Sequence, residues 1–148
     1  MKLASYKATR PGFQGIYSRV ARTVDASPYS HSELIFSDGM SASSSFIDNG
    51  VRFKHIIYDP DHWDIIDAPG DEAKARKWFE DHEGVGYDTP GTLRFGAWFI
   101  PHSRSRRFCS EAIAEALGFP DPWRFGPGGL HAVVSYLAMQ MSKPPTPT

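Results

Sequence analysis

The feature that most constrains the fold is a series of short, strand-like segments between residues 31 and 68, separated by turn sequences. The first two segments flank Asp38-Gly39, the next follows the sequence IDNG, and the last ends at Pro69-Gly70. Asp-Gly and Asn-Gly pairs favour tight hairpin turns, and β-branched and aromatic residues favour strands. The pattern predicts an antiparallel β-meander over residues 31–68.

Helical patterns follow this meander. Residues 71–84 open with acidic residues and end at a glycine, residues 109–118 also end at a glycine, and residues 130–141 form a third apolar pattern. Acidic residues in a first turn and glycine after a last turn are typical helix boundaries. Residues 15–25 could begin a strand or a short helix. We therefore expect an α+β fold, with helices before and after the meander.

Composition limits the classes of protein that the chain can represent. With 148 residues and 41% hydrophobic residues, it suits one folded domain, expected over residues 1–142, with a flexible Pro/Thr-rich tail at 143–148. A net charge of −1 gives no electrostatic argument for binding nucleic acid, and three arginines in residues 104–108 are too few for such a surface. No apolar segment approaches the roughly 18 residues of a membrane span.

The chain has one cysteine, so it cannot form an internal disulfide. The N-terminal sequence has no apolar signal-peptide core, and we expect synthesis in the cytoplasm without a signal peptide. A single cysteine and scattered histidines give no zinc-binding spacing, so we expect no metal and no organic cofactor.

The cysteine, Cys109, stands where a loop becomes a helix, in the sequence RRFCSEAIAEALGF. Free N–H groups and the helix dipole at a helix N-terminus favour the thiolate, which is the nucleophilic form, and the neighbouring Arg106 and Arg107 act in the same direction. The alternative is that Cys109 is a small buried apolar residue.

A nucleophilic thiol needs a base, and the base needs an orienting group. Among six histidines, His31 stands out because Glu33 follows two positions later in a predicted strand. Residues two apart in a strand share one face, so Glu33 could hold the imidazole in one tautomer. The alternative is a solvent-facing polar pair.

The sequences YSHSELIFSDG, GYDTPG and FCSEAIAEALG, in this order, resemble the circularly permuted branch of the NlpC-type papain-like cysteine hydrolases. In that branch the histidine strand precedes the cysteine helix, which is the order in this chain; ordinary members have the reverse order. The resemblance covers roughly residues 29–135. It implies a papain-like antiparallel meander or small barrel packed against helices, with the nucleophile at a helix N-terminus.

The resemblance also implies roles for individual residues. Cys109 matches the nucleophile and His31 the general base. Tyr87, in the sequence GYD, matches a tyrosine that such enzymes place beside the nucleophile, where its hydroxyl can help to bind an oxyanion. The alternative for Tyr87 is a half-buried loop tyrosine.

The source of the third catalytic residue varies within the family. Glu33 matches if this residue comes from the histidine strand. If it comes from the next strand, the matching positions are Ser43, Ser44 and Ser45, and a serine would orient the imidazole weakly. Both assignments stay open from the sequence.

The implied activity is that of a thiol peptidase or amidase, which cleaves an amide bond in a cell-wall peptide or similar substrate through a thioester. Two alternatives remain. One is an acyltransferase or thioesterase of the lecithin retinol acyltransferase type, although no membrane-seeking apolar segment is visible. The other is a non-catalytic phage or host-interaction module that retains the fold, since small permuted members without signal peptides resemble phage- or prophage-encoded proteins.

Overall fold

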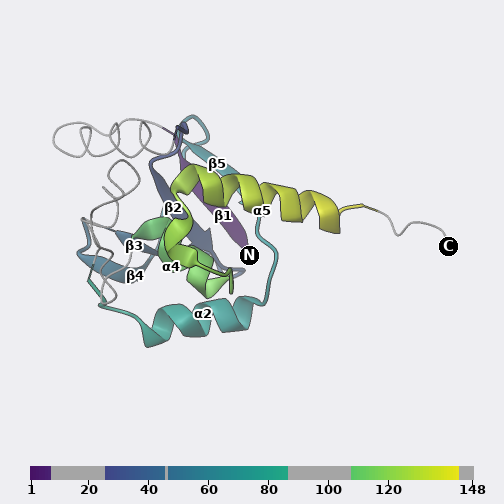
Figure 1. The fold of residues 1–148 in the computed structure, drawn as a ribbon. Helices are drawn as coiled ribbons and strands as arrows, with labels where there is room; N and C mark the ends of the chain where they lie inside the picture. The colour runs from purple at the N-terminus through teal and green to yellow at the C-terminus, as the bar shows by residue number, and fades with distance from the viewer. Residues whose placement is uncertain (8–25, 46, 87–107, 144–148) are drawn as a thin grey trace.

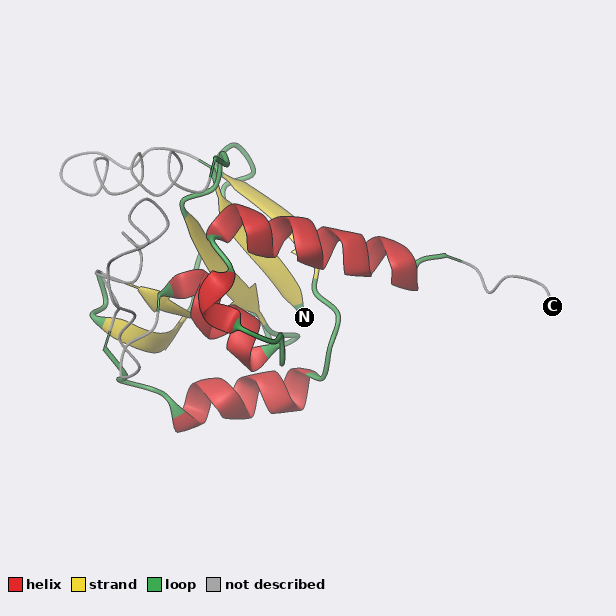
Figure 2. Ribbon diagram, in the orientation of Figure 1, coloured by secondary structure: helices red, strands yellow, loops and turns green. Residues whose placement is uncertain are grey.

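The computed structural model describes residues 1–7, 26–45, 47–86 and 108–143. Within these residues the chain is α+β, with a five-stranded antiparallel sheet, three α-helices and one short 3₁₀ helix (Figures 1 and 2). In chain order the elements are β1 (Lys2–Tyr6), β2 (His31–Ile35), β3 (Ser41–Ser45), β4 (Gly50–Lys54), β5 (Trp63–Asp67), α2 (Glu72–Asp81), α4 (Cys109–Ala116), η1 (Pro122–Arg124) and α5 (Pro127–Met141).

The strand order across the sheet is β4-β3-β2-β1-β5. The predicted meander is confirmed for β2, β3 and β4, but it is wrong for β5, which pairs with β1 at the opposite edge of the sheet. The reason is β1 itself, which inserts between β2 and β5 and pairs antiparallel with both. Residues 55–62 therefore connect one edge of the sheet to the other.

One face of the sheet forms the core with the helices. Figure 1 shows α4 in front of β2 and β3, α5 crossing the sheet near β1 and β5, and α2 below α4, in agreement with the packing contacts of these elements. Fully buried apolar side chains from sheet and helices meet there: Leu3, Leu34, Ala42, Ala75, Phe79, Ala112, Ile113, Leu130 and Val134. Burying each large side chain stabilises the fold by about 1.5–3 kcal/mol, and this packing fixes α4 against the strands that it covers.

The starts of α2 and α5 carry residues that are typical of helix N-termini. Asp71 accepts a hydrogen bond from the N–H of Lys74 and caps the start of α2, inside the predicted range of 71–84. The last predicted helix begins three residues earlier than expected, because Pro127 occupies the first turn of α5. None of the helices in the described part of the chain has the length and apolar character needed to cross a bilayer. The element expected in residues 15–25 and nearly all of the tail lie outside the described residues.

Candidate active site

Cys109 is the first residue of α4, and Phe108 precedes it in an extended conformation. The first hydrogen bond of the helix joins the N–H of Ala112 to the carbonyl oxygen of Phe108, at 3.0 Å. The N–H of Cys109 therefore has no acceptor within the helix, and the positive end of the helix dipole lies beside the thiol. Ser110 Oγ donates to the carbonyl oxygen of Phe125 at 2.7 Å and anchors this first turn. The predicted helix-start position of Cys109 is confirmed.

The structure brings Cys109 and His31 together. His31 is the first residue of β2, and α4 packs against β2 and β3. Cys109 lies close enough to the His31 imidazole for its charge and its hydrogen-bonding capacity to raise the pKa of that ring. On its other side the imidazole contacts Glu33, with 2.7 Å between Nε2 and Oε1. Because Nε2 is engaged by Glu33, Nδ1 is the ring nitrogen that remains for the thiol.

The environment of His31 favours its charged form. Burial lowers the pKa of the imidazole, since only 14% of the side chain is exposed, but several interactions oppose this effect. The negative charge of Cys109 and its hydrogen bond are the largest of them, followed by the hydrogen bond and charge of Glu33. Together they raise the pKa of His31 to about 9 from 6.5. An imidazolium beside a sulfur at a helix start is the arrangement that favours a thiolate–imidazolium pair.

Glu33 is buried and ionised. Its side chain is 1% exposed, and burial raises its pKa, but hydrogen bonds from Arg52 and His31 outweigh burial and lower the pKa below its ordinary value. Arg52 grips the carboxylate with two hydrogen bonds, from Nη1 to Oε2 at 2.7 Å and from Nη2 to Oε1 at 2.6 Å. The expected alternative of a solvent-facing His31–Glu33 pair is therefore wrong.

From the sequence, the serines of β3 could orient the imidazole, but the structure shows a different contact for Ser43. Ser43 Oγ donates to the carbonyl oxygen of Ser32 at 2.6 Å, so it joins β3 to β2 beside His31. Ser44 projects to the opposite face of the strand from Ser43 and Ser45. Of the candidate orienting residues that the sequence left open, Glu33 is the one whose contact with the imidazole the structure shows.

Two further predicted residue groups cannot be placed. Tyr87 lies outside the described residues, and so do Arg106 and Arg107. Among the residues that the structure describes, no group of three or more histidine, cysteine, aspartate or glutamate side chains could hold a metal ion.

Sequence reasoning missed Arg52 and Trp63. Trp63 is 8% exposed, and its ring lies 6.3 Å from that of His31 in an edge-on arrangement. The Tyr58 ring lies 5.0 Å from Trp63, so two aromatic side chains border the polar cluster. Arg52 had a weak signal, because it is a charged residue inside the apolar segment VRF. Its partner Glu33 lies two strands away, which the sequence does not show.

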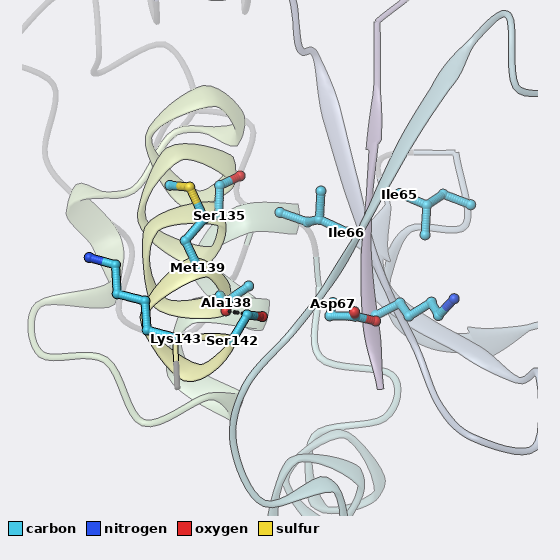
Figure 3. Close-up of a pocket in the computed structure, with 9 residues that line it drawn as sticks. Ile65, Ile66, Asp67, Ser135, Ala138, Met139, Ser142 and Lys143 are labelled. Carbon is cyan, nitrogen blue, oxygen red and sulfur yellow. Dashed lines mark hydrogen bonds between the residues drawn. The ribbon is translucent and has the colours of Figure 1, made fainter. Parts of the chain in front are cut away.

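A separate pocket of about 560 Å³ lies between α5 and β5 (Figure 3). Ile65, Ile66, Ala138 and Met139 contribute its apolar lining, and Lys2 also borders it. Lys2 pairs with Ile35 and Asp67, at the end of the strands opposite to His31. This pocket is therefore distinct from the Cys109–His31 pair.

No protein-family model matches the chain, and no curated protein matches it either. The arrangement of Cys109, His31, Glu33 and Arg52 is therefore the feature of the protein that points to a function.

Proposed function

We propose that the protein is a cysteine hydrolase that cleaves an amide bond through a thioester on Cys109. The observation that carries the proposal is a helix-start thiol beside the imidazole whose pKa it raises, with that imidazole in 2.7 Å contact with a buried carboxylate. Nucleophile, base and orienting group in hydrogen-bond contact are the arrangement that thiol-dependent acyl transfer requires. A structural cysteine in an apolar core needs neither partner.

The reaction proceeds in two halves. Thiolate Cys109 attacks the carbonyl carbon, and the backbone N–H of Cys109 stabilises the resulting oxyanion. Protonated His31 donates its proton to the leaving nitrogen as the carbon–nitrogen bond breaks, which releases the amine and leaves a thioester. Water then attacks the thioester with His31 as the base, and the carboxylic acid leaves with regeneration of the thiolate. Glu33 orients the imidazole and stabilises its charged form throughout.

The fold and substrate class belong to the same proposal. A histidine strand that precedes a cysteine helix in the chain, in an α+β protein in which this helix packs against that strand, is consistent with a circularly permuted papain-like hydrolase. The resemblance to the NlpC-type enzymes suggests a cell-wall peptide as the substrate, and hence a thiol peptidase or amidase.

The experiment that tests acyl transfer uses p-nitrophenyl acetate as a probe. We expect a burst of about one p-nitrophenolate per protein molecule and an acetyl adduct that mass spectrometry locates on Cys109. The variant His31→Ala should slow the burst by about 100-fold or more, whereas His55→Ala, at an exposed histidine, should not change it.

A wild-type rate no higher than that of free cysteine, or an adduct at another residue, would contradict the proposal and favour a non-catalytic module. Where the burst is present, purified peptidoglycan fragments test the substrate class. Release of new amino groups from them, absent in Cys109→Ala, is the expected result. A burst without hydrolysis of these fragments would still support acyl transfer on Cys109, but it would overturn the assignment of a cell-wall peptide as the substrate.

A further inference from the structure

Arg52 and Glu33 lie on strands that are not neighbours. Glu33 is on β2 and Arg52 on β4, with β3 between them. Adjacent strands are about 4.8 Å apart, so the guanidinium must extend across a whole strand to reach the carboxylate. The residue it crosses is Ser43, which is paired with Arg52 in the β3–β4 register. A small side chain at this position, tied to the carbonyl oxygen of Ser32, leaves the path across β3 open.

The guanidinium is held on both sides. Its two terminal nitrogens bind Glu33, and its Nε donates to Asp48 Oδ2 at 2.9 Å. The Arg52 side chain is 13% exposed and that of Glu33 is 1% exposed, so water competes little for the pair. A planar guanidinium that binds both oxygens fixes the plane of the carboxylate as well as its position.

The bidentate contact of Arg52 with Glu33 has a direct consequence for the imidazole of His31. Glu33 Oε1 contacts both Arg52 and His31, so the carboxylate cannot rotate away from His31 without losing its hydrogen bonds to Arg52. An ionised carboxylate can only accept hydrogen bonds, so Nε2 of His31 must carry the proton. Without Arg52, burial would favour the protonated acid, which can donate to Nε2 and reverse the tautomer.

We infer that Arg52 is a positioning residue of the proposed hydrolase: it keeps Glu33 ionised and in one orientation, so that His31 presents Nδ1 to Cys109. The inference rests on the proposed function, and it adds a fourth residue to the chain Cys109–His31–Glu33. Arg52 acts through Glu33 and does not touch the reacting atoms.

The test compares Arg52→Lys and Arg52→Gln with the wild-type protein. The first readout is the rate at which iodoacetamide alkylates Cys109 across the pH range. The second is the tautomer of neutral His31, read by ¹⁵N NMR above the pKa of about 9. We expect Arg52→Gln to lower the alkylation rate at neutral pH by about tenfold or more and to yield a mixture of tautomers. Arg52→Lys keeps the positive charge but loses the bidentate contact with Glu33. Its alkylation rate should therefore lie between those of Arg52→Gln and the wild-type protein.

Arg76→Lys is the matched control, because Arg76 also forms a 2.6 Å ion pair, with Asp38, but belongs to α2. It should leave both readouts unchanged. If wild-type Cys109 reacts no faster than free cysteine, the proposed function fails. If the wild-type protein reacts rapidly, His31→Ala reacts slowly, and both Arg52 variants follow the wild-type pH profile and tautomer, the role of Arg52 alone is overturned.

If both Arg52 variants fail to fold, NMR measurements on the wild-type protein still test the inference. We expect the ¹³C signal of the Glu33 carboxylate to titrate below its ordinary range and the neutral His31 to carry its proton on Nε2. A Glu33 carboxylate that titrates above its ordinary range, or a neutral His31 protonated on Nδ1, would overturn the inference.

Discussion

His31 Nε2 lies 2.7 Å from Glu33 Oε1, and the two residues stand two positions apart on one face of β2. The base and its orienting group therefore come from the same strand, and the backbone of β2 alone places their side chains on one face. The nucleophile comes from a different element, the start of α4, and Arg52 from a third, β4. The sheet fixes the orientation of the base, and the packing of α4 against β2 and β3 sets its distance from the thiol.

His31→Ala should slow the alkylation of Cys109 by iodoacetamide by about tenfold or more at neutral pH. The variant removes the imidazole, whose pKa is raised beside Cys109, and with it the cationic partner that assists a nucleophilic sulfur. Second-order rate constants measured at several pH values check this prediction, with His55→Ala as the control. Equal rates in His31→Ala and the wild-type protein would show that another group activates the thiol.

Glu33→Gln should lower both the reactivity of Cys109 and the stability of the fold. Arg52 loses its principal anionic partner, and removing one member of a buried ion pair costs about 3 kcal/mol. Urea denaturation measures the change in the free energy of unfolding. Its matched comparison is Ser43→Ala, which removes one neutral hydrogen bond to Ser32, costs about 1 kcal/mol and should leave Cys109 reactive. If Ser43→Ala instead abolishes the reactivity, the orienting role belongs to β3.

The pairing of His31 with Glu33 was within reach of the sequence, because period-two geometry places both side chains on one face. The position of Cys109 was equally accessible, since a glycine-terminated helix pattern begins there. The bidentate contact of Arg52 was not, because it crosses β3 and depends on the small side chain of Ser43. Contacts between non-adjacent strands are absent from local patterns.

The sheet order, like the site, was predictable from the sequence only where it depends on local residues. Turn sequences predicted the hairpins from β2 to β4, because hairpin turns are determined by local residues. The strand β1 has the sequence KLASY, whose small residues give a weak strand signal. Its buried central position comes from pairing on both sides with β2 and β5. Without β1, the most economical prediction placed β5 beside β4, and this prediction was wrong.

Glu72→Gln should weaken the fold at neutral pH and reduce its sensitivity to acid. Hydrogen bonds from the side chain and the N–H of Ser37 lower the pKa of Glu72 to about 2 from 4.5. A carboxylate with a lowered folded-state pKa stabilises the fold above its unfolded value, and this contribution is lost as the pH falls from 4.5 toward 2.

For this partly exposed group the contribution is about 2 kcal/mol after solvent screening. Urea unfolding at neutral pH and at about pH 3 measures it. The difference between Glu72→Gln and the wild-type protein should be largest at neutral pH and should shrink in acid. A difference that stays constant with pH would mean that the ionisation of Glu72 does not contribute.

The two glycines Gly50 and Gly39 should respond very differently to alanine. Both have positive φ, at 143° and 83°, so each substitution strains the backbone. A Cβ at Gly39 would meet nothing within 4 Å, whereas a Cβ at Gly50 would overlap the carbonyl oxygen of Val85. That same oxygen accepts a 2.8 Å hydrogen bond from the N–H of Val51, and Gly84 donates to the carbonyl oxygen of Val51. The segment that follows α2 is thereby held against the start of β4.

Gly39→Ala should therefore cost about 1 kcal/mol, through backbone strain alone. Gly50→Ala should cost about 3 kcal/mol or more, because relief of the overlap requires β4 and the segment at Val85 to separate. Arg52 lies two residues beyond Gly50, so this separation should also displace the guanidinium from Glu33 and lower the alkylation rate of Cys109. Urea denaturation and the iodoacetamide rate, measured on both variants, check the two effects together. Equal losses of stability in the two variants would show that the contact with Val85 adjusts without a free-energy cost. An unchanged alkylation rate in Gly50→Ala would show that Arg52 keeps its contact with Glu33 when the start of β4 moves.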